Sequence, residues 1–132
     1  MRYDIDINAQ YKELFLYVIE LIESFEGMTQ RRTQNLTSFY CEGSGICYLR
    51  TTEEKGLTIA MFKGAFLEDR CNLFSGSGKT IRHMYMLKKE DIKKEILLEY
   101  FQNAVVYNIE KEEKKLMAKA YKNKKKSDNY HF

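Results

Sequence analysis

The segment GSGKTIRH, residues 76–83, carries the densest group of side chains in the chain that could bind an anion. Gly76 and Gly78 lack a Cβ, so a ligand can approach their backbone N–H groups closely. Lys79 and Arg82 add positive charge, and an arginine guanidinium can form two parallel hydrogen bonds with a carboxylate or a phosphate. The pattern predicts a binding site for a small anion or for a segment of a protein partner.

The acids Glu68 and Asp69, which come shortly before this segment, allow a structural interpretation of the same residues. Arg82 could pair with either acid across the loop while the glycines form the turn, since structural ion pairs are common. We count Asp69 and His83 with the candidate ligand-binding residues, and both interpretations stay open. His83 shares a strand face with apolar and aromatic residues, so we expect a hydrogen-bonded, partly buried histidine rather than a catalytic one.

The letters SGSGKT look like a phosphate-binding loop, but their spacing does not fit that motif. A loop of the form G-x-x-x-x-G-K-[ST] needs a glycine five positions before Gly78, where Leu73 stands. The motif also opens into a helix whose N-terminal amides hold the phosphate, whereas Thr80–Leu87 has the pattern of a strand. Nucleoside triphosphate binding is therefore not expected.

Acidic side chains gather near the start of the chain, where Glu13, Glu20 and Glu23 share an expected helix and Asp4 and Asp6 precede it. Hard cations such as ferrous iron, magnesium and calcium prefer such oxygen ligands. Glu13 and Glu20 lie two helical turns apart, about 10 Å, so spacing alone does not bring them to one point. A solvated helix face is the simpler interpretation, and a weak metal site formed by the three glutamates is the alternative.

The chain has three cysteines, Cys41, Cys47 and Cys71, and their odd number does not fit a secreted disulfide framework. We expect reduced thiols in a cytoplasmic protein. The cysteines and His83 have no regular zinc-ligand spacing, and Cys71 with His83 is not supported as a nucleophile–base pair. Because no catalytic constellation emerges, the sequence predicts a protein that is not an enzyme and has no cofactor.

Length and composition indicate one folded domain. The chain has 132 residues, of which 44% are apolar and 31% charged, so it can build a core without disulfides or metal. It contains no run of about 18 apolar residues that could span a membrane, and its N-terminus lacks the apolar region of a signal peptide. These features favour a cytoplasmic protein and exclude a membrane protein and a multidomain enzyme.

Charge is distributed unevenly, although the net charge is only +3. Residues 1–26 contain six acids and two basic residues, whereas residues 111–132 contain eight lysines and three acids. A basic tail can contact nucleic acid without sequence preference. Scattered tyrosines, Tyr121 and Tyr130, accompany these lysines, and a stacking surface needs aromatic residues interleaved with the basic ones. Nucleic acid is therefore the least favoured partner, and a solvated, solubilising tail is expected.

Periodicity predicts a helix at each end of the chain. Apolar residues recur at helical spacing from about Asn8 to Phe25, with Asn8 as the N-cap and Gly27 as the stop. The second helix has the same spacing from about Ile96 and continues toward residue 121. Beyond it, the lysine-rich end is expected to fray.

Strands are expected in the middle, because all seven glycines lie between residues 27 and 78. The short connection TTEEKG predicts a hairpin between the expected strands Ile46–Thr51 and Leu57–Phe62. A face with Met84, Met86 and Tyr48 is either core or a dimer surface, which leaves monomer and homodimer open. Helix, antiparallel strands and helix is the element order of an α+β sandwich. The four expected strands are Ser38–Cys41, Ile46–Thr51, Leu57–Phe62 and Thr80–Leu87.

From Ile46 to about Val106 the sequence resembles the domain-of-unknown-function 1801 family, also called YdhG-like. Members of this family carry a strand ending in F-x-G, a loop with an acidic residue and a leucine, and a G-[ST]-G-K-x-x-R-H strand before an amphipathic helix. Arg70 departs from the pattern, because many relatives have a proline there. The matching residues are Phe62, Gly64, Leu67, Asp69, Gly76, Gly78, Lys79, Arg82 and His83.

The resemblance implies an α+β fold like that of frataxin, an iron chaperone, in which an antiparallel sheet is backed on one face by the N- and C-terminal helices. It also implies that acids on the first helix could bind and deliver iron. We therefore expect one YdhG-like domain over residues 1–121 and a basic tail over residues 122–132. The expected function is a small binding module with its site at the GSGK turn. Iron delivery by the acidic helix and nucleic-acid contact by the tail are the alternatives.

Overall fold

The computed structural model describes residues 1–129, with side chains through residue 125. The α-helices are α1 (Arg2–Asp6), α2 (Lys12–Glu23) and α3 (Lys94–Asn129). The strands are β1 (Met28–Arg32), β2 (Thr37–Cys41), β3 (Ser44–Thr52), β4 (Gly56–Met61) and β5 (Arg82–Met86). Two short 3₁₀ helices are η1 (Gly64–Phe66) and η2 (Lys89–Asp91).

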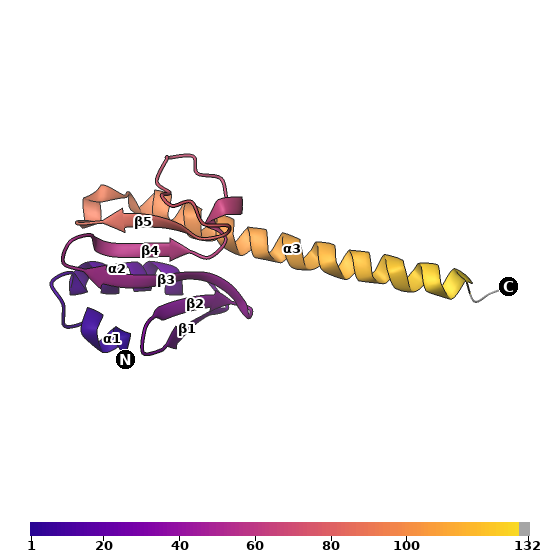
Figure 1. The fold of residues 1–132 in the computed structure, drawn as a ribbon, viewed down its shortest axis with the longest axis horizontal. Helices are drawn as coiled ribbons and strands as arrows, with labels where there is room; N and C mark the ends of the chain where they lie inside the picture. Colours follow the sequence, from indigo (N-terminus) through magenta and orange to yellow (C-terminus); the bar gives the residue numbers. More distant parts are fainter. Residues whose placement is uncertain (130–132) are drawn as a thin grey trace.

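The strands form one antiparallel sheet in the order β1-β2-β3-β4-β5, so each strand pairs with its neighbours in the sequence (Figure 1). The hairpin expected from TTEEKG is present, and it joins β3 to β4. Gly56 ends this turn at a φ of +74°, a left-handed conformation that glycine adopts without steric strain. β2 and β3 change register between Phe39 and Tyr40, where a bulge lets Ile46 enter the core.

The core lies between one face of this sheet, the inner face, and the two longer helices. Leu57, Ile59 and Met61 alternate along β4 and are fully buried on the inner face. α2 and α3 cover that face and lie behind the sheet in Figure 1. The structure therefore confirms an α+β fold with an antiparallel sheet backed by the N- and C-terminal helices. The helices contribute Leu14, Phe15, Val18, Ile19, Leu21, Ile22, Leu97, Tyr100, Phe101 and Ala104 to the core.

Successive side chains of β5 point alternately into the core and toward the other face of the sheet, which we call the outer face. Met84 and Met86 are buried in the core, so they are not a dimer surface. His83 and Tyr85 lie on the outer face, where His83 is half-buried and Tyr85 exposed. β5 begins at Arg82 rather than at Thr80, because the preceding residues form an exposed loop.

The N-terminal helix of the sequence analysis is two helices in the structure. α2 begins at Lys12, and Asn8 is not its N-cap: its side-chain amide donates to the carbonyl of Asp4 at the end of α1. α1 is held to the sheet by Asp6, which accepts hydrogen bonds from the backbone N–H and the hydroxyl of Thr51 at 3.1 and 2.7 Å. The guanidinium of Arg2 pairs with the same carboxylate.

β1 is a strand that the sequence analysis did not predict. Its residues, MTQRR, are half-buried or exposed, so they show no apolar alternation. The strand forms because Gly27, at a φ of +80°, turns the chain back after α2 and lets Met28 pair with Cys41 of β2. Backbone hydrogen bonds to β2, rather than burial, hold this edge strand.

α3 continues far beyond the sheet (Figure 1). Its buried residues end at Asn108, whose side-chain amide donates to the carbonyl of Gly45. The helix includes residues 122–129, which were expected to fray. The expectation for residues 130–132 lies outside the described residues. No helix in residues 1–129 is both long enough and apolar enough to cross a membrane.

Candidate functional site

The GSGK turn lies at the β5 edge of the sheet. Ser75 pairs with His83 through two backbone hydrogen bonds of 2.9 Å, which starts the loop beside the strand. Gly76 has a φ of +114°, so the turn requires a residue without a Cβ. Gly78 and Lys79 are exposed. The structure thus places Lys79 in solvent at the rim of the sheet.

The guanidinium of Arg82 is engaged within this turn. Its Nη1 donates to the carbonyl oxygens of Gly78 and Ile81 at 2.6 and 2.8 Å. These carbonyls are its partners in place of Glu68 or Asp69, the acids that the structural interpretation had named. Arg82 therefore closes its own loop, and only part of its guanidinium is open to a ligand.

Asp69 organises the loop before the turn. Its carboxylate accepts hydrogen bonds from the backbone N–H groups of Leu73 and Phe74 at 2.7 and 3.0 Å, and from the Tyr100 hydroxyl at 2.6 Å. Burial opposes ionisation of Asp69, but these hydrogen bonds outweigh it and hold the pKa of the carboxyl below its ordinary value. The hydroxyl of Tyr100 also accepts from the N–H of Cys71 at 2.9 Å. Asp69 thus fastens the loop to α3 and does not face a ligand.

The acids of the first helix do not converge on one point. Glu20 and Glu23 line one hollow beside Arg32, whereas Glu13 lines another beside Tyr17. All three glutamates are exposed. Within the part of the chain that the structure describes, no three Asp, Glu, His or Cys side chains are grouped as metal ligands would be.

The three cysteines are unpaired in the described structure. Cys47 is completely buried, and burial raises the pKa of its thiol far above the usual range. Burial, followed by the nearby charge of Glu42, also raises the pKa of Cys41. These thiols lack the electropositive, exposed surroundings of a reactive cysteine.

The outer face of the sheet carries a group of aromatic side chains that the sequence analysis did not assemble. We call this surface the open face and define it by Arg31, Tyr40, Tyr48, Arg50, Thr58, Phe62, His83 and Tyr85, which are exposed or half-buried. The ring of Phe62 lies 6.2 Å from that of Tyr40 and 5.9 Å from that of Tyr48. At the β5 side, the rings of His83 and Tyr85 stack 6.2 Å apart.

Positive charge accompanies these rings. The guanidinium carbon of Arg31 lies 4.6 Å from the centre of the Tyr40 ring, and the ammonium of Lys55 lies 5.2 Å from that of Tyr85. Arg50 is exposed between them on β3. The five strands contain no Asp or Glu at all. The open face is therefore both aromatic and basic.

The register of the sheet explains why this surface was missed. Tyr48 pairs with Ser38 on one side and with Ala60 on the other, and Ala60 pairs with His83. Small buried residues between the strands thus leave room for the rings to approach one another. The alternation within β5 already grouped His83 with Tyr85, but the neighbours on other strands depend on pairing that one strand does not reveal.

Comparison with known proteins adds no relative: no family model, no curated protein and no solved structure matches the chain.

Proposed function

We propose that this protein is a non-catalytic binding protein that holds a single-stranded nucleic acid on its open face. The observation that carries the proposal is the cluster of Tyr40, Tyr48 and Phe62 on an uncovered sheet surface that has arginines and no acid in its strands. Aromatic rings and basic groups on one surface are the two components that single strands require.

The rings offer platforms on which bases can stack. Every base has a π-face, so stacking on an aromatic side chain is worth about 1–3 kcal/mol per base and depends little on sequence. Tyr40 lies on β2, toward one edge of the open face, and His83 and Tyr85 lie on β5 at the other edge. A strand that crosses the sheet therefore meets stacking surfaces at both ends of its path.

The cations supply contacts for the phosphates between those bases. Arg31 lies beside Tyr40, Lys55 beside Tyr85 and Arg50 between them. Three phosphate contacts on a single strand imply a slope of about −2 in log K against log salt concentration. Lys79 of the GSGK turn stands at the β5 rim, where Ser75 meets His83. In this proposal, the anion site expected from the sequence contacts the phosphates at one end of the bound strand.

Single strands suit this surface better than duplexes do. A duplex keeps its bases stacked on one another and presents phosphates and groove edges, so aromatic rings on a flat sheet find no free base. An unpaired strand can splay its bases onto the rings. An acidic peptide would use the cations but would leave the aromatic cluster without a matching partner.

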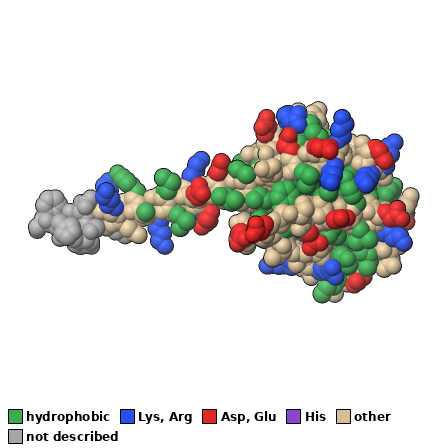
Figure 2. All heavy atoms as spheres, turned by 180° about the vertical axis from the view of Figure 1, so that it is seen from behind, with side chains coloured by type: hydrophobic (Ala, Val, Ile, Leu, Met, Phe, Trp, Pro, Cys, Tyr) green, Lys and Arg blue, Asp and Glu red, His purple; other side chains and the backbone are tan. Residues whose placement is uncertain are grey.

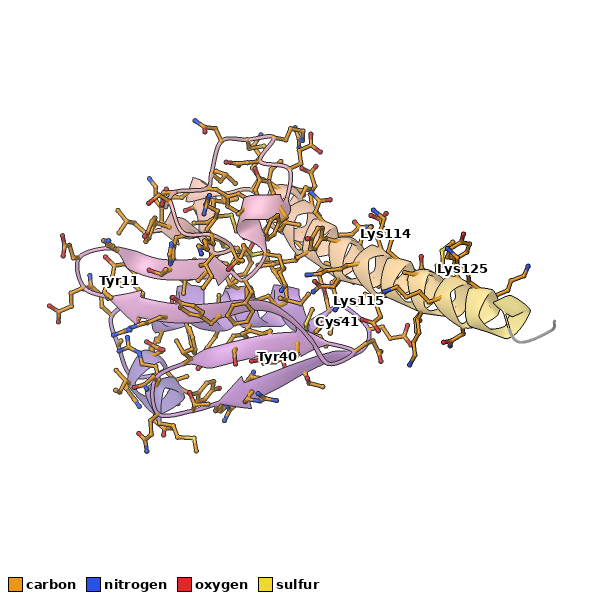
Figure 3. The ribbon with its side chains drawn as sticks, turned by 45° about the vertical axis from the view of Figure 1, so that its right-hand side comes forward. Tyr11, Tyr40, Cys41, Lys114, Lys115 and Lys125 are labelled. Atoms are coloured by element: carbon orange, nitrogen blue, oxygen red, sulfur yellow. The ribbon has the colours of Figure 1, made fainter. Side chains whose placement is uncertain are left out.

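The experiment is fluorescence anisotropy of a labelled oligothymidylate or oligouridylate titrated with the protein. Tyr40→Ala should weaken binding by about tenfold, since one base–ring stack is lost. Tyr11→Ala is the matched control, because Tyr11 is also a half-buried tyrosine but lies at the start of α2 (Figure 3). Circular dichroism shows whether each variant keeps its fold.

Equal binding by the two variants would contradict the proposal, as would an affinity for the oligonucleotide that does not change with salt. Binding that persists in Tyr40→Ala but is lost when the lysines of α3 are removed would assign the contact to α3 instead. A duplex of the same sequence that competes equally well would also refute recognition by stacking.

The proposal extends to the family and to the compartment of the protein. Membership of the YdhG-like family is supported by the position of the GSGK turn directly before β5 and of the amphipathic helix α3 after it. A cytoplasmic location is supported by three unpaired cysteines. Iron delivery by Glu13, Glu20 and Glu23 has no comparable support, because Glu13 lines a different hollow from Glu20 and Glu23.

A further inference from the structure

The part of α3 beyond the sheet presents apolar side chains to solvent. Residues 109–125 are all exposed, including Ile109, Leu116 and Met117, at 50%, 59% and 72% exposure. Figure 2 shows hydrophobic side chains along the protruding helix among charged ones. Helices in proteins draw most of their stability from packing of an apolar face. A partner surface that covers these side chains would therefore stabilise this segment.

The apolar residues follow one side of the helix. Successive residues turn by 100°, so Ile109, Leu116 and Ala120 point in nearly the same direction, with Met117 beside them. Glu112 and Lys119 are seven residues apart and share one edge of this stripe. An apolar stripe with an acid and a base along the same edge is the pattern of a helix that pairs with another helix.

Charge is arranged oppositely at the two ends of the segment. Residues 110–113, three glutamates and Lys111, lie at the end nearer the sheet, where Glu112 and Glu113 line a hollow with Cys41, whereas residues 114–125 carry lysines and no acid. Lys114, Lys115 and Lys125 stand along the protruding part in Figure 3. Two such helices repel each other when parallel, because like charges then face like charges. In the antiparallel arrangement the acidic end of each helix lies beside the basic end of the other.

A groove with a matching character lies where α3 leaves the sheet. Its volume is about 200 Å³, and its apolar lining includes Cys41, Val105, Ile109 and Leu116. The charged residues that line it are all acidic: Glu42, Glu112 and Glu113. An apolar groove with an acidic rim fits a helix that carries both apolar and lysine side chains.

We propose that residues 109–125 of α3 pair antiparallel with the same residues of a second copy of this chain. Glu112 of each copy then faces Lys119 of the other, and the two Leu116 side chains meet near the two-fold axis. This register places the lysine-rich end of each helix at the acidic groove of its partner. Because the interface is isologous, every contact occurs twice. The open face lies on the opposite side of the sheet from α2 and α3, so the pairing leaves it uncovered.

The test is the oligomeric state of the full chain without nucleic acid, measured by sedimentation equilibrium over a wide range of protein concentration. The wild-type protein should dimerise. Glu112→Lys and Lys119→Glu should each weaken the dimer by about tenfold or more, since two symmetry-related attractions become repulsions. The combined variant E112K/K119E restores both pairs and should return the dimer constant to near the wild-type value. Glu54→Lys, an equal charge change in the exposed β3–β4 turn, is the control and should leave the constant unchanged.

A wild-type chain that stays monomeric at every concentration would overturn the proposal. So would a combined variant that stays as weak as the single ones, because rescue requires that these two positions face each other across the axis. Equal weakening by Glu54→Lys would show that net charge rather than this interface governs association. Circular dichroism of each variant confirms that the fold is intact before its mass is compared.

Discussion

The hydroxyl of Tyr100 is the most informative single group to remove from this fold. It donates to the Asp69 carboxylate at 2.6 Å and accepts from the N–H of Cys71 at 2.9 Å, so it joins α3 to the loop between η1 and β5. A hydrogen bond to a charged group contributes about 1.5–3 kcal/mol, and a neutral one about 1 kcal/mol. Tyr100→Phe should therefore lower the free energy of unfolding by about 3 kcal/mol, with the ring packing kept.

Urea denaturation followed by circular dichroism measures this loss at neutral pH. Tyr107→Phe is the matched control: Tyr107 stacks on Phe66, and its hydroxyl makes no hydrogen bond within the described residues. It should change stability by less than about 0.5 kcal/mol. If Tyr100→Phe costs no more than the control, the Asp69–Tyr100 bond does not hold the loop and the reasoning fails.

The stability difference between wild type and Tyr100→Phe should depend on pH. The pKa of Asp69 is held below its ordinary 3.8, so its contribution is present above pH 3.8 and is lost as pH falls through the folded-state pKa. Burial and the bond to Asp69 raise the pKa of Tyr100 to about 12, so the contribution of the neutral hydroxyl is lost as pH rises from 10 toward that value. The stability difference between wild type and Tyr100→Phe should therefore shrink at both extremes. A constant difference across this range would refute the assignment.

Two further predictions concern the turns and the core. Gly43 and Gly56 both have left-handed φ values, but an added Cβ meets open space at Gly43 and clashes with the carbonyl oxygen of Met86 at Gly56. Gly43→Ala should lower the free energy of unfolding, measured by urea denaturation, by about 1–2 kcal/mol. Gly56→Ala should lower it clearly more, and equal losses for the two variants would contradict the clash at Gly56. With a thiol reagent, half-buried Cys71 should react first and Cys47 only at the rate of unfolding, because burial raises its pKa and excludes the reagent. Early labelling of Cys47 in the native state would contradict that burial.

The sequence predicted the elements whose burial follows a regular period. β4 alternates and lies where the pattern indicated, and α2 repeats its apolar residues at helical spacing and lies within the expected segment, although it begins at Lys12 rather than at Asn8. β1 escaped prediction because it is an edge strand with polar side chains, held by backbone pairing to β2. Asn8 was misplaced because a side chain that can cap one helix can also bond the end of the helix before it.

The candidate site was harder to predict because it depends on contacts between distant segments. The sequence placed acids near Arg82, yet the carbonyls of Gly78 and Ile81 are closer once the loop folds. The residues of the open face come from all five strands, so the face exists only after the register is set. The composition of the sequence revealed the basic segment of α3. The groove that complements it could not be predicted, because it forms only when the turn between β2 and β3 approaches the helix.

The matching order of the strands in the sequence and in the sheet has a consequence for how the chain folds during synthesis. β2, β3 and β4 can each join the strand made just before it across a short loop, and such local contacts form quickly, whereas β5 joins β4 only after the longer segment 62–81 has been made. The sheet can therefore grow as the chain leaves the ribosome, N-terminal part first. Leu97 and Phe101, which cover much of the inner face, are made after all five strands. Until they arrive, part of that apolar face stays in water, so the synthesis of α3 decides when the core closes.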